Sequence, residues 1–112
     1  MSVSYNGFNE KAITFRTKEK IADNTFVKIS ANDTVAACAS GDVFCGIVAT
    51  GDNKHATVLT NGTVTVPYTG TAPTLGYCNL VANGTGGVSV DANGRECLVL
   101  SINSGNKVTF IY

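Results

Sequence analysis

The chain has little of what catalytic and metal sites are usually built from. Its 112 residues include one histidine, one methionine, two prolines and no tryptophan, and only 14% are charged. Soluble domains usually carry about 25% charged residues, so much of this surface must consist of Thr, Ser, Asn and Gly. These residues favour strands and turns. Hydrophobic residues make up 44% of the chain, which excludes the disordered class and predicts one domain with one core.

The residues that carry enzyme chemistry stand apart from one another. The only histidine, His55, has no second histidine with which to build a metal site. Zinc sites usually open with two cysteines separated by two to four residues, and the closest pair here is Cys38 and Cys45. The segment Asp91–Glu96 lacks the spacing of a calcium loop. We therefore expect a protein that is not an enzyme and that has no metal and no cofactor.

Four of the five aspartates fall in predicted turns, where their side chains bond to nearby backbone groups. These are Asp33, Asp42, Asp52 and Asp91.

Segments that would place the chain in or across a membrane are not found. No apolar run reaches the roughly 18 residues of a membrane span, and the N-terminus lacks the basic start and apolar run of a secretory signal. We therefore expect cytoplasmic synthesis, no membrane partner and reduced cysteines that pack as small hydrophobes. A disulfide in an oxidising setting remains an open alternative for Cys38, Cys45, Cys78 and Cys97.

The charge balance argues against nucleic acid. Net charge is zero, whereas a duplex-binding protein needs surplus Lys and Arg to displace counterions. Residues 1–28 carry five basic and three acidic side chains, a balance of +2, and the remainder is −2. The result is a mildly basic N-terminal region on a mildly acidic body.

Short β-rich runs separated by turn residues fill most of the chain. No stretch shows the 3.6-residue periodicity of an amphipathic helix. About nine or ten strands at this spacing are typical of an all-β barrel or sandwich with mostly antiparallel strands. The expected strands are 13–16, 25–30, 34–39, 43–49, 55–60, 63–68, 75–81, 87–91, 95–102 and 107–112.

The pair Asn61-Gly62 gives the clearest turn signal. Both residues tolerate the positive φ of a type I′ hairpin, and β-rich runs lie on either side. This pattern predicts a hairpin that places Leu59 opposite Val64.

The N-terminal region is expected to differ from the rest. Residues 1–20 are predicted to be an extended, flexible arm with the first short strand, and residues 21–112 to be the β-barrel domain. Tyr5 and Phe8 lie in this arm. Exposed aromatic residues on an arm favour ordering against a partner, for example by adding a strand to its sheet. The alternative is that the arm frays or folds back onto the barrel.

The order of these segments resembles a known family. The run ITFRTKEKIADNTFVKI is followed by TVAACASGDVFCGIVA, then TVTVPYTG, then GYCNLVANGTGGVSVD. Over roughly residues 13–112 this pattern is similar to the small all-β head decoration, or capsid cement, proteins of tailed bacteriophages.

The resemblance implies a non-enzymatic structural protein of the phage or prophage virion. Such a protein is made in the bacterial cytoplasm and binds the outer capsid surface, often as a homotrimer, with the major capsid protein as partner. Carried over to this chain, the resemblance makes the arm the capsid-contact region. The apolar contacts would be Tyr5, Phe8, Ile13 and Phe15, and the contacts with acidic capsid surface would be Arg16, Lys18 and Lys20.

Two other functions remain open. One is a tail or baseplate accessory domain, because similar small barrels occur there and a fold does not specify a function. The other is a cytoplasmic barrel that binds a small ligand, which a polar-lined pocket near His55, Tyr68 and Tyr77 would favour.

Overall fold

The protein is all-β, as the sequence predicts. The computed structural model describes residues 11–112, and within this range it contains no helix and hence none that could span a membrane. The ten strands are β1 (Lys11–Arg16), β2 (Phe26–Ala31), β3 (Thr34–Ala37), β4 (Gly46–Gly51), β5 (His55–Asn61), β6 (Thr63–Thr69), β7 (Gly76–Ala82), β8 (Val88–Val90), β9 (Arg95–Asn103) and β10 (Lys107–Ile111).

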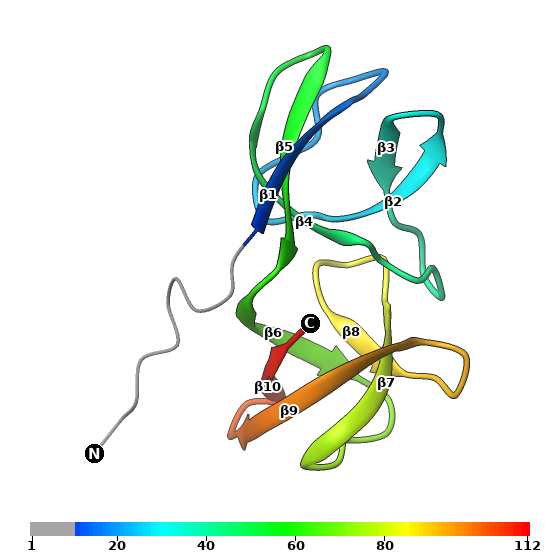
Figure 1. Ribbon diagram of the computed structural model, residues 1–112. Coiled ribbons are helices and arrows are strands. Elements are labelled where there is room, and N and C mark those ends of the chain that lie inside the picture. The colour runs from blue at the N-terminus through cyan, green and yellow to red at the C-terminus, as the bar shows by residue number, and fades with distance from the viewer. Residues whose placement is uncertain (1–10) are drawn as a thin grey trace.

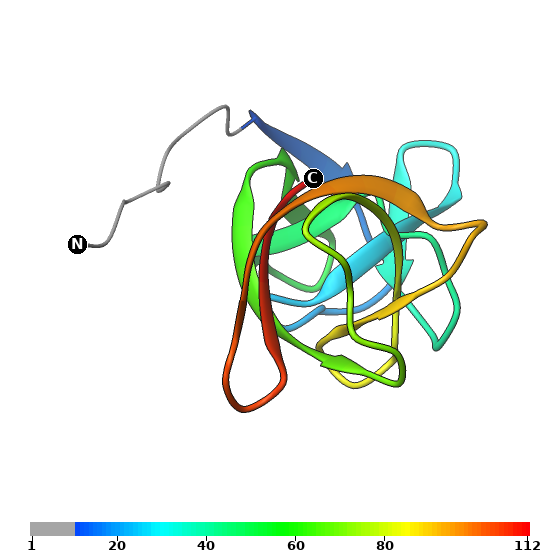
Figure 2. The same ribbon diagram turned by 90° about the horizontal axis from the view of Figure 1, so that it is seen from below.

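The ten strands form two sheets, and each sheet closes on itself. The first sheet has the order β1-β3-β2-β4-β5 and the second β10-β6-β8-β7-β9. Figure 1 shows the first sheet above the second, and Figure 2 shows the strands wrapped around a central axis. Most neighbours are antiparallel; β1 with β3 and β6 with β8 are the parallel pairs. The first sheet closes through a single pair of residues, Arg16 of β1 with Thr34 of β3.

The predicted hairpin at Asn61-Gly62 is wrong. β5 pairs with β1 and β4, whereas β6 pairs with β10 and β8, so Leu59 and Val64 are not partners. Gly62 has a φ of 158°, close to extended backbone. It exchanges two backbone hydrogen bonds with Tyr112, at 3.0 and 3.4 Å. The chain therefore passes straight from the first sheet into the second, because the C-terminal residue provides the pairing that a hairpin partner would have supplied.

The segment 43–49 also differs from its prediction as one continuous strand. β4 begins only at Gly46, and the fully buried Phe44 precedes it outside the sheet. A Cβ on Gly46 would lie 2.4 Å from the Leu59 carbonyl oxygen. Glycine is therefore required by a close approach of β4 and β5 at this point.

Two hydrophobic clusters fill the molecule. The smaller one lies inside the first sheet and contains Ile21, Val27, Val35, Val48, Ala56 and Val58. The larger one joins the two sheets, because Phe26, Phe44 and Ile47 pack with residues of the second sheet that include Leu80, Val99, Phe110 and Tyr112. The Phe26 and Phe44 ring centroids are 4.6 Å apart. The two sheets thus share a core, as expected for one domain.

Arg95, at the start of β9, links the two sheets through polar contacts. Its guanidinium donates hydrogen bonds to the carbonyls of Cys45 at 2.9 Å, Thr60 at 3.1 Å and Phe44 at 3.4 Å. The guanidinium carbon also lies 5.8 Å from the Phe44 ring centroid and 5.4 Å from that of Tyr112. A flat cation with five donors suits such a site, since it satisfies carbonyls and stacks on rings at once.

The first short strand predicted for residues 1–20 belongs to the barrel. β1 pairs along its length with β5 and meets β3 at Arg16. Phe15 packs against the core of the first sheet, and Thr17 is buried. Any arm outside the barrel is therefore restricted to residues before Lys11.

Replacing Arg95 with Ala is expected to lower the free energy of unfolding by about 2–4 kcal/mol, because three half-buried carbonyls lose a charged donor. Urea denaturation measures this change. The exposed Arg16→Ala is the matched control and should change stability by no more than about 0.5 kcal/mol. Equal effects of the two substitutions would contradict the role assigned to Arg95.

Candidate functional site

Five of the seven predicted capsid-contact residues lie in the part of the chain that the structure describes. Ile13, Phe15 and Arg16 are in β1, and Lys18 and Lys20 follow it. Tyr5 and Phe8 fall outside residues 11–112. The five residues lie close together along the chain, but they do not share one environment.

The two apolar members of this group differ in exposure. Ile13 and Phe15 are opposite the buried residues Val58 and Ala56 of β5, so their side chains lie on the inner face. Phe15 is half-buried against the core, whereas Ile13 remains 49% exposed. Phe15 thus has a structural role, and Ile13 is the apolar side chain of β1 that is open to a partner.

The basic members are exposed and have neighbours that the sequence did not reveal. Arg16 is the cross-strand partner of His55, and the Thr17 amide donates to the Lys54 carbonyl at 2.9 Å. The tip of the first sheet therefore gathers Arg16, Lys18, Lys54 and His55. Residues 54 and 55 are far from residue 16 in sequence, so only the β1–β5 register shows that they belong together.

Asp52 organises the loop that presents Lys54 and His55. One carboxylate oxygen accepts hydrogen bonds from both of their amides, each at 2.8 Å. These bonds lower the pKa of Asp52 from its usual value. Asp52 acts as the turn residue that the sequence predicts.

A second carboxylate, Asp42, forms an ion pair with Lys28 at 2.6 Å and accepts the Ala39 amide at 2.8 Å. The hydrogen bond from Lys28 and that from Ala39 lower the pKa of Asp42, and the same ion pair raises the pKa of Lys28. The pair ties β2 to the loop before Phe44.

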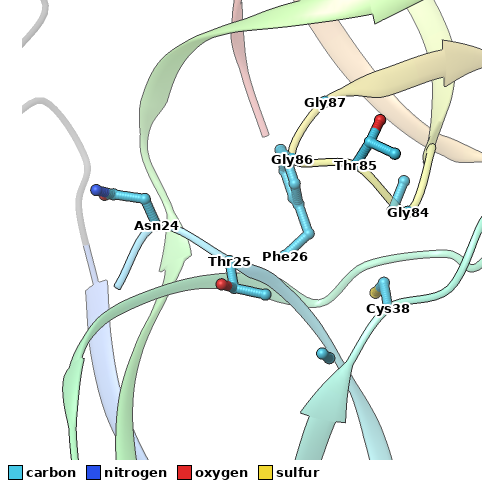
Figure 3. Close-up of a pocket in the computed structure, with 10 residues that line it drawn as sticks. Asn24, Thr25, Phe26, Cys38, Gly84, Thr85, Gly86 and Gly87 are labelled. Carbon is cyan, nitrogen blue, oxygen red and sulfur yellow. The ribbon is translucent and has the colours of Figure 1, made fainter. Parts of the chain in front are cut away.

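A pocket of about 250 Å³ lies where the two sheets meet. Asn24, Thr25, Phe26 and Cys38 line it from the first sheet, and the loop from Gly84 to Gly87 lines it from the second (Figure 3). The Phe26 side chain extends from β2 toward Gly86. Burial raises the pKa of the Cys38 thiol to about 12, so this thiol is protonated at neutral pH.

The glycine-rich loop of this pocket is not arranged as an anion cradle. Its amides at Thr85 and Gly87 donate to the side-chain oxygen of Asn83, at 2.9 and 3.0 Å. These amides are therefore already satisfied inside the loop. A phosphate-binding loop needs backbone amides that point at the ligand.

A polar-lined pocket near His55, Tyr68 and Tyr77, which would favour a ligand-binding barrel, is not one of the two described pockets. The second, of about 200 Å³, is lined by residues of the first sheet and of the segment after β1 that include Thr17, Lys18, Ile21 and Val35. His55 is exposed at the tip of the first sheet, and Tyr77 is exposed on β7. The three residues are not gathered into one site.

Within residues 11–112, no group of three or more His, Cys, Asp or Glu side chains is placed to hold a metal ion.

The second sheet carries an outer apolar stripe, formed by Tyr77, Leu98 and Ile111. These residues are cross-strand partners on β7, β9 and β10. Leu98 and Ile111 are half-buried, Tyr77 is 71% exposed, and Leu75 just before it is 67% exposed. Large apolar side chains grouped on an outer face are typical of a surface that contacts another protein.

This stripe has no signal in the sequence, because Tyr77 and Leu98 are residue types common in any strand. Only the pairing of β7 with β9 places them side by side.

A scan against protein-family models and a search of curated proteins found no match to this chain.

Acid is expected to destabilise the wild-type protein partly through Asp42. A carboxyl whose pKa is lowered in the folded state contributes stability above its unfolded pKa, and that contribution is lost as the pH falls through the folded pKa. Asp42→Asn should therefore lose less stability than the wild type between about pH 5 and pH 2. Urea midpoints across this range measure the difference.

Lys28→Gln removes the same ion pair by changing its cation. This variant should also lose less stability than the wild type between about pH 5 and pH 2. An unchanged pH dependence in both variants would contradict the prediction.

Proposed function

We propose that this protein is a non-enzymatic structural component of a phage or prophage virion that binds and stabilises the outer capsid surface. The observation that carries the proposal is the outer apolar stripe, which ends in the exposed Tyr77. A surface of this kind suits permanent contact with protein better than catalysis. The resemblance of the segment order over residues 13–112 to head decoration proteins supplies the particular role.

Two different surfaces support two kinds of contact. The tip of the first sheet is polar and carries Arg16, Lys18 and Lys54 next to the exposed Asp33 and Asp52. Its three cations suit acidic groups of a partner surface. The outer apolar stripe is on the second sheet and is uncharged. We assign the basic tip and Ile13, with the preceding arm, to the major capsid protein. We assign the stripe to contacts between copies of this chain in a homotrimer, since cores of homo-oligomer interfaces are more apolar than other surfaces.

Binding alone would account for stabilisation of a shell. A ligand that binds the assembled state and not its separated parts shifts the equilibrium toward assembly. Many identical sites on a lattice add their contributions, so each contact needs only modest affinity. This mechanism requires neither a reactive group nor a cofactor.

Quantitative mass spectrometry of purified particles tests the proposal. The chain should be present in copy numbers comparable to those of the major capsid protein, and it should be removable without loss of the tail. A handful of copies per particle would instead indicate a tail or baseplate component. Complete absence from particles would overturn the virion role and favour a ligand-binding barrel.

Charge reversal at the basic tip provides the matched variants for this measurement. Lys18→Glu combined with Lys54→Glu should reduce the copy number on particles. Lys107→Glu, at the exposed start of β10, should leave it unchanged. Equal occupancy of both variants would contradict the assignment of the basic tip.

The stripe is tested separately by sedimentation velocity. The wild-type chain should sediment as a trimer, and Tyr77→Asp should shift it to a monomer, because burial of a charge in an apolar contact is costly. Val90→Asp changes an exposed apolar residue on β8 and should keep the trimer. A wild-type protein that remains monomeric at all concentrations would contradict this interface.

A further inference from the structure

The four cysteines form two unequal pairs. All four carry free thiols, with Cys97 buried and the other three half-buried. Cys78 on β7 and Cys97 on β9 are directly opposite each other in an antiparallel ladder. Cys38 and Cys45 lie instead on either side of β2. The two pairs therefore differ in whether a covalent bond can join them.

The Cys78–Cys97 pair has the backbone geometry of a disulfide. Directly opposed residues in antiparallel strands have Cα atoms about 4.5–5.5 Å apart, and disulfides span Cα distances of about 4.4–6.8 Å. Residues opposite each other also point to the same face. Cys97 is in the core that joins the sheets, and Cys78 packs against that core.

The two thiols also lean in the same direction along the ladder. The Cys97 Sγ lies 3.4 Å from the Arg95 carbonyl oxygen, and the Cys78 Sγ lies 4.0 Å from that of Asn79. Asn79 is opposite Glu96, and Arg95 is opposite Leu80, so both contacts point toward the same end of the ladder. Both sulfurs therefore lie toward the same end of the ladder and on the same face of the sheet.

Cys38 and Cys45 cannot form a disulfide without backbone movement, because β2 lies between them. Val27 of β2 pairs with Ala37 on one side and with Gly46 on the other. Cys38 follows Ala37, and Cys45 precedes Gly46. Two strand spacings amount to roughly 9.5 Å, which exceeds the 7 Å beyond which a disulfide requires backbone movement.

We propose that Cys78 and Cys97 form an oxidation site at which a small-molecule disulfide, such as glutathione disulfide, converts two thiols into one intrachain disulfide. The Cys78 thiolate attacks one sulfur of the reagent and releases one thiolate. Cys97 then attacks the Cys78 sulfur of the mixed disulfide, loses its proton and releases the second thiolate. The two cysteines are oxidised, and the reagent is reduced to two thiols.

The order of the two steps follows from how accessible each thiol is to the reagent. Cys78 is half-buried and meets the reagent first, whereas Cys97 is 1% exposed. Burial raises the pKa of Cys97 to about 12, so its thiol is protonated at neutral pH and attacks slowly. The closing step should therefore be the slower one and should accelerate as the pH rises.

The bond would lie close to the contact that joins the sheets. Cys97 is two residues after Arg95 on the same strand, and a link from β9 to β7 would fix the strand on which Arg95 depends. The inference does not rest on the proposed function, because it needs only the register of β7 and β9.

Tryptic mapping of the full chain after incubation with glutathione disulfide tests the proposal. Trypsin cuts after Lys28, Lys54, Arg95 and Lys107, which places Cys38 and Cys45 together in 29–54, Cys78 in 55–95 and Cys97 in 96–107. We expect free thiols to fall from four to two, and 55–95 to be linked to 96–107. The link should disappear on reduction.

Two variants serve as controls. Cys38→Ser should still lose two thiols and give the same linked peptides. Cys78→Ser should keep its three thiols free, because Cys97 has no partner. The proposal is overturned if all four wild-type thiols persist, if glutathione remains on Cys78 without closure, or if the link involves Cys38, Cys45 or a second chain.

Discussion

The guanidinium of Arg95 is the contact on which the joined structure depends. Each five-stranded sheet closes on itself, so neither needs the other to complete its ladder of hydrogen bonds. Something else must fix how the two sheets meet. Arg95 does this from β9 by donating to carbonyls of Phe44 and Cys45, which precede β4, and of Thr60 in β5. Those carbonyls belong to the first sheet and its loop, so this one side chain makes three of the polar contacts between the sheets, beside the backbone hydrogen bonds that Ala82 of β7 exchanges with Gly41 and Asp42.

The aromatic core acts together with this cation. Phe44 stands outside any strand, yet it contacts Phe26, Phe110 and Tyr112, which belong to both sheets and the chain end. Tyr112 adds a hydrogen bond from its hydroxyl to the Leu59 carbonyl at 3.0 Å. Aromatic rings supply large buried area and define relative orientation, while the donors of Arg95 and Tyr112 satisfy backbone oxygens that the joint would otherwise bury. The interface between the sheets is consequently both apolar and hydrogen-bonded.

The strands could be predicted from the sequence because they depend on local signals, but several of their partners could not. The turn residues at 103–106 separate the expected strands 95–102 and 107–112, and in the structure β9 and β10 pair antiparallel across them. Asn61-Gly62 carries the clearest turn signal of the chain, yet it forms no hairpin, because Tyr112 takes both backbone groups of Gly62. The role of Arg95 could not be predicted either, because in the sequence it is one more charged residue after a turn. Its three carbonyl acceptors lie 35 to 51 positions away along the chain.

The same limit applies to the surfaces from which function is inferred. Ile13, Arg16, Lys18 and Lys20 are close in sequence, so they could be predicted together as contact residues from one segment of the chain. The outer apolar stripe draws on the consecutive strands β9 and β10 and on β7, which β8 separates from them in sequence. The facing cysteines are likewise separated in sequence by all of β8. A strand that closes a sheet brings residues that are distant in sequence into register. No local sequence signal marks such a pairing, because the register is set by packing of the whole face. Sites made by sheet closure therefore become visible only with the topology, whereas sites made by one segment can be predicted from its residues.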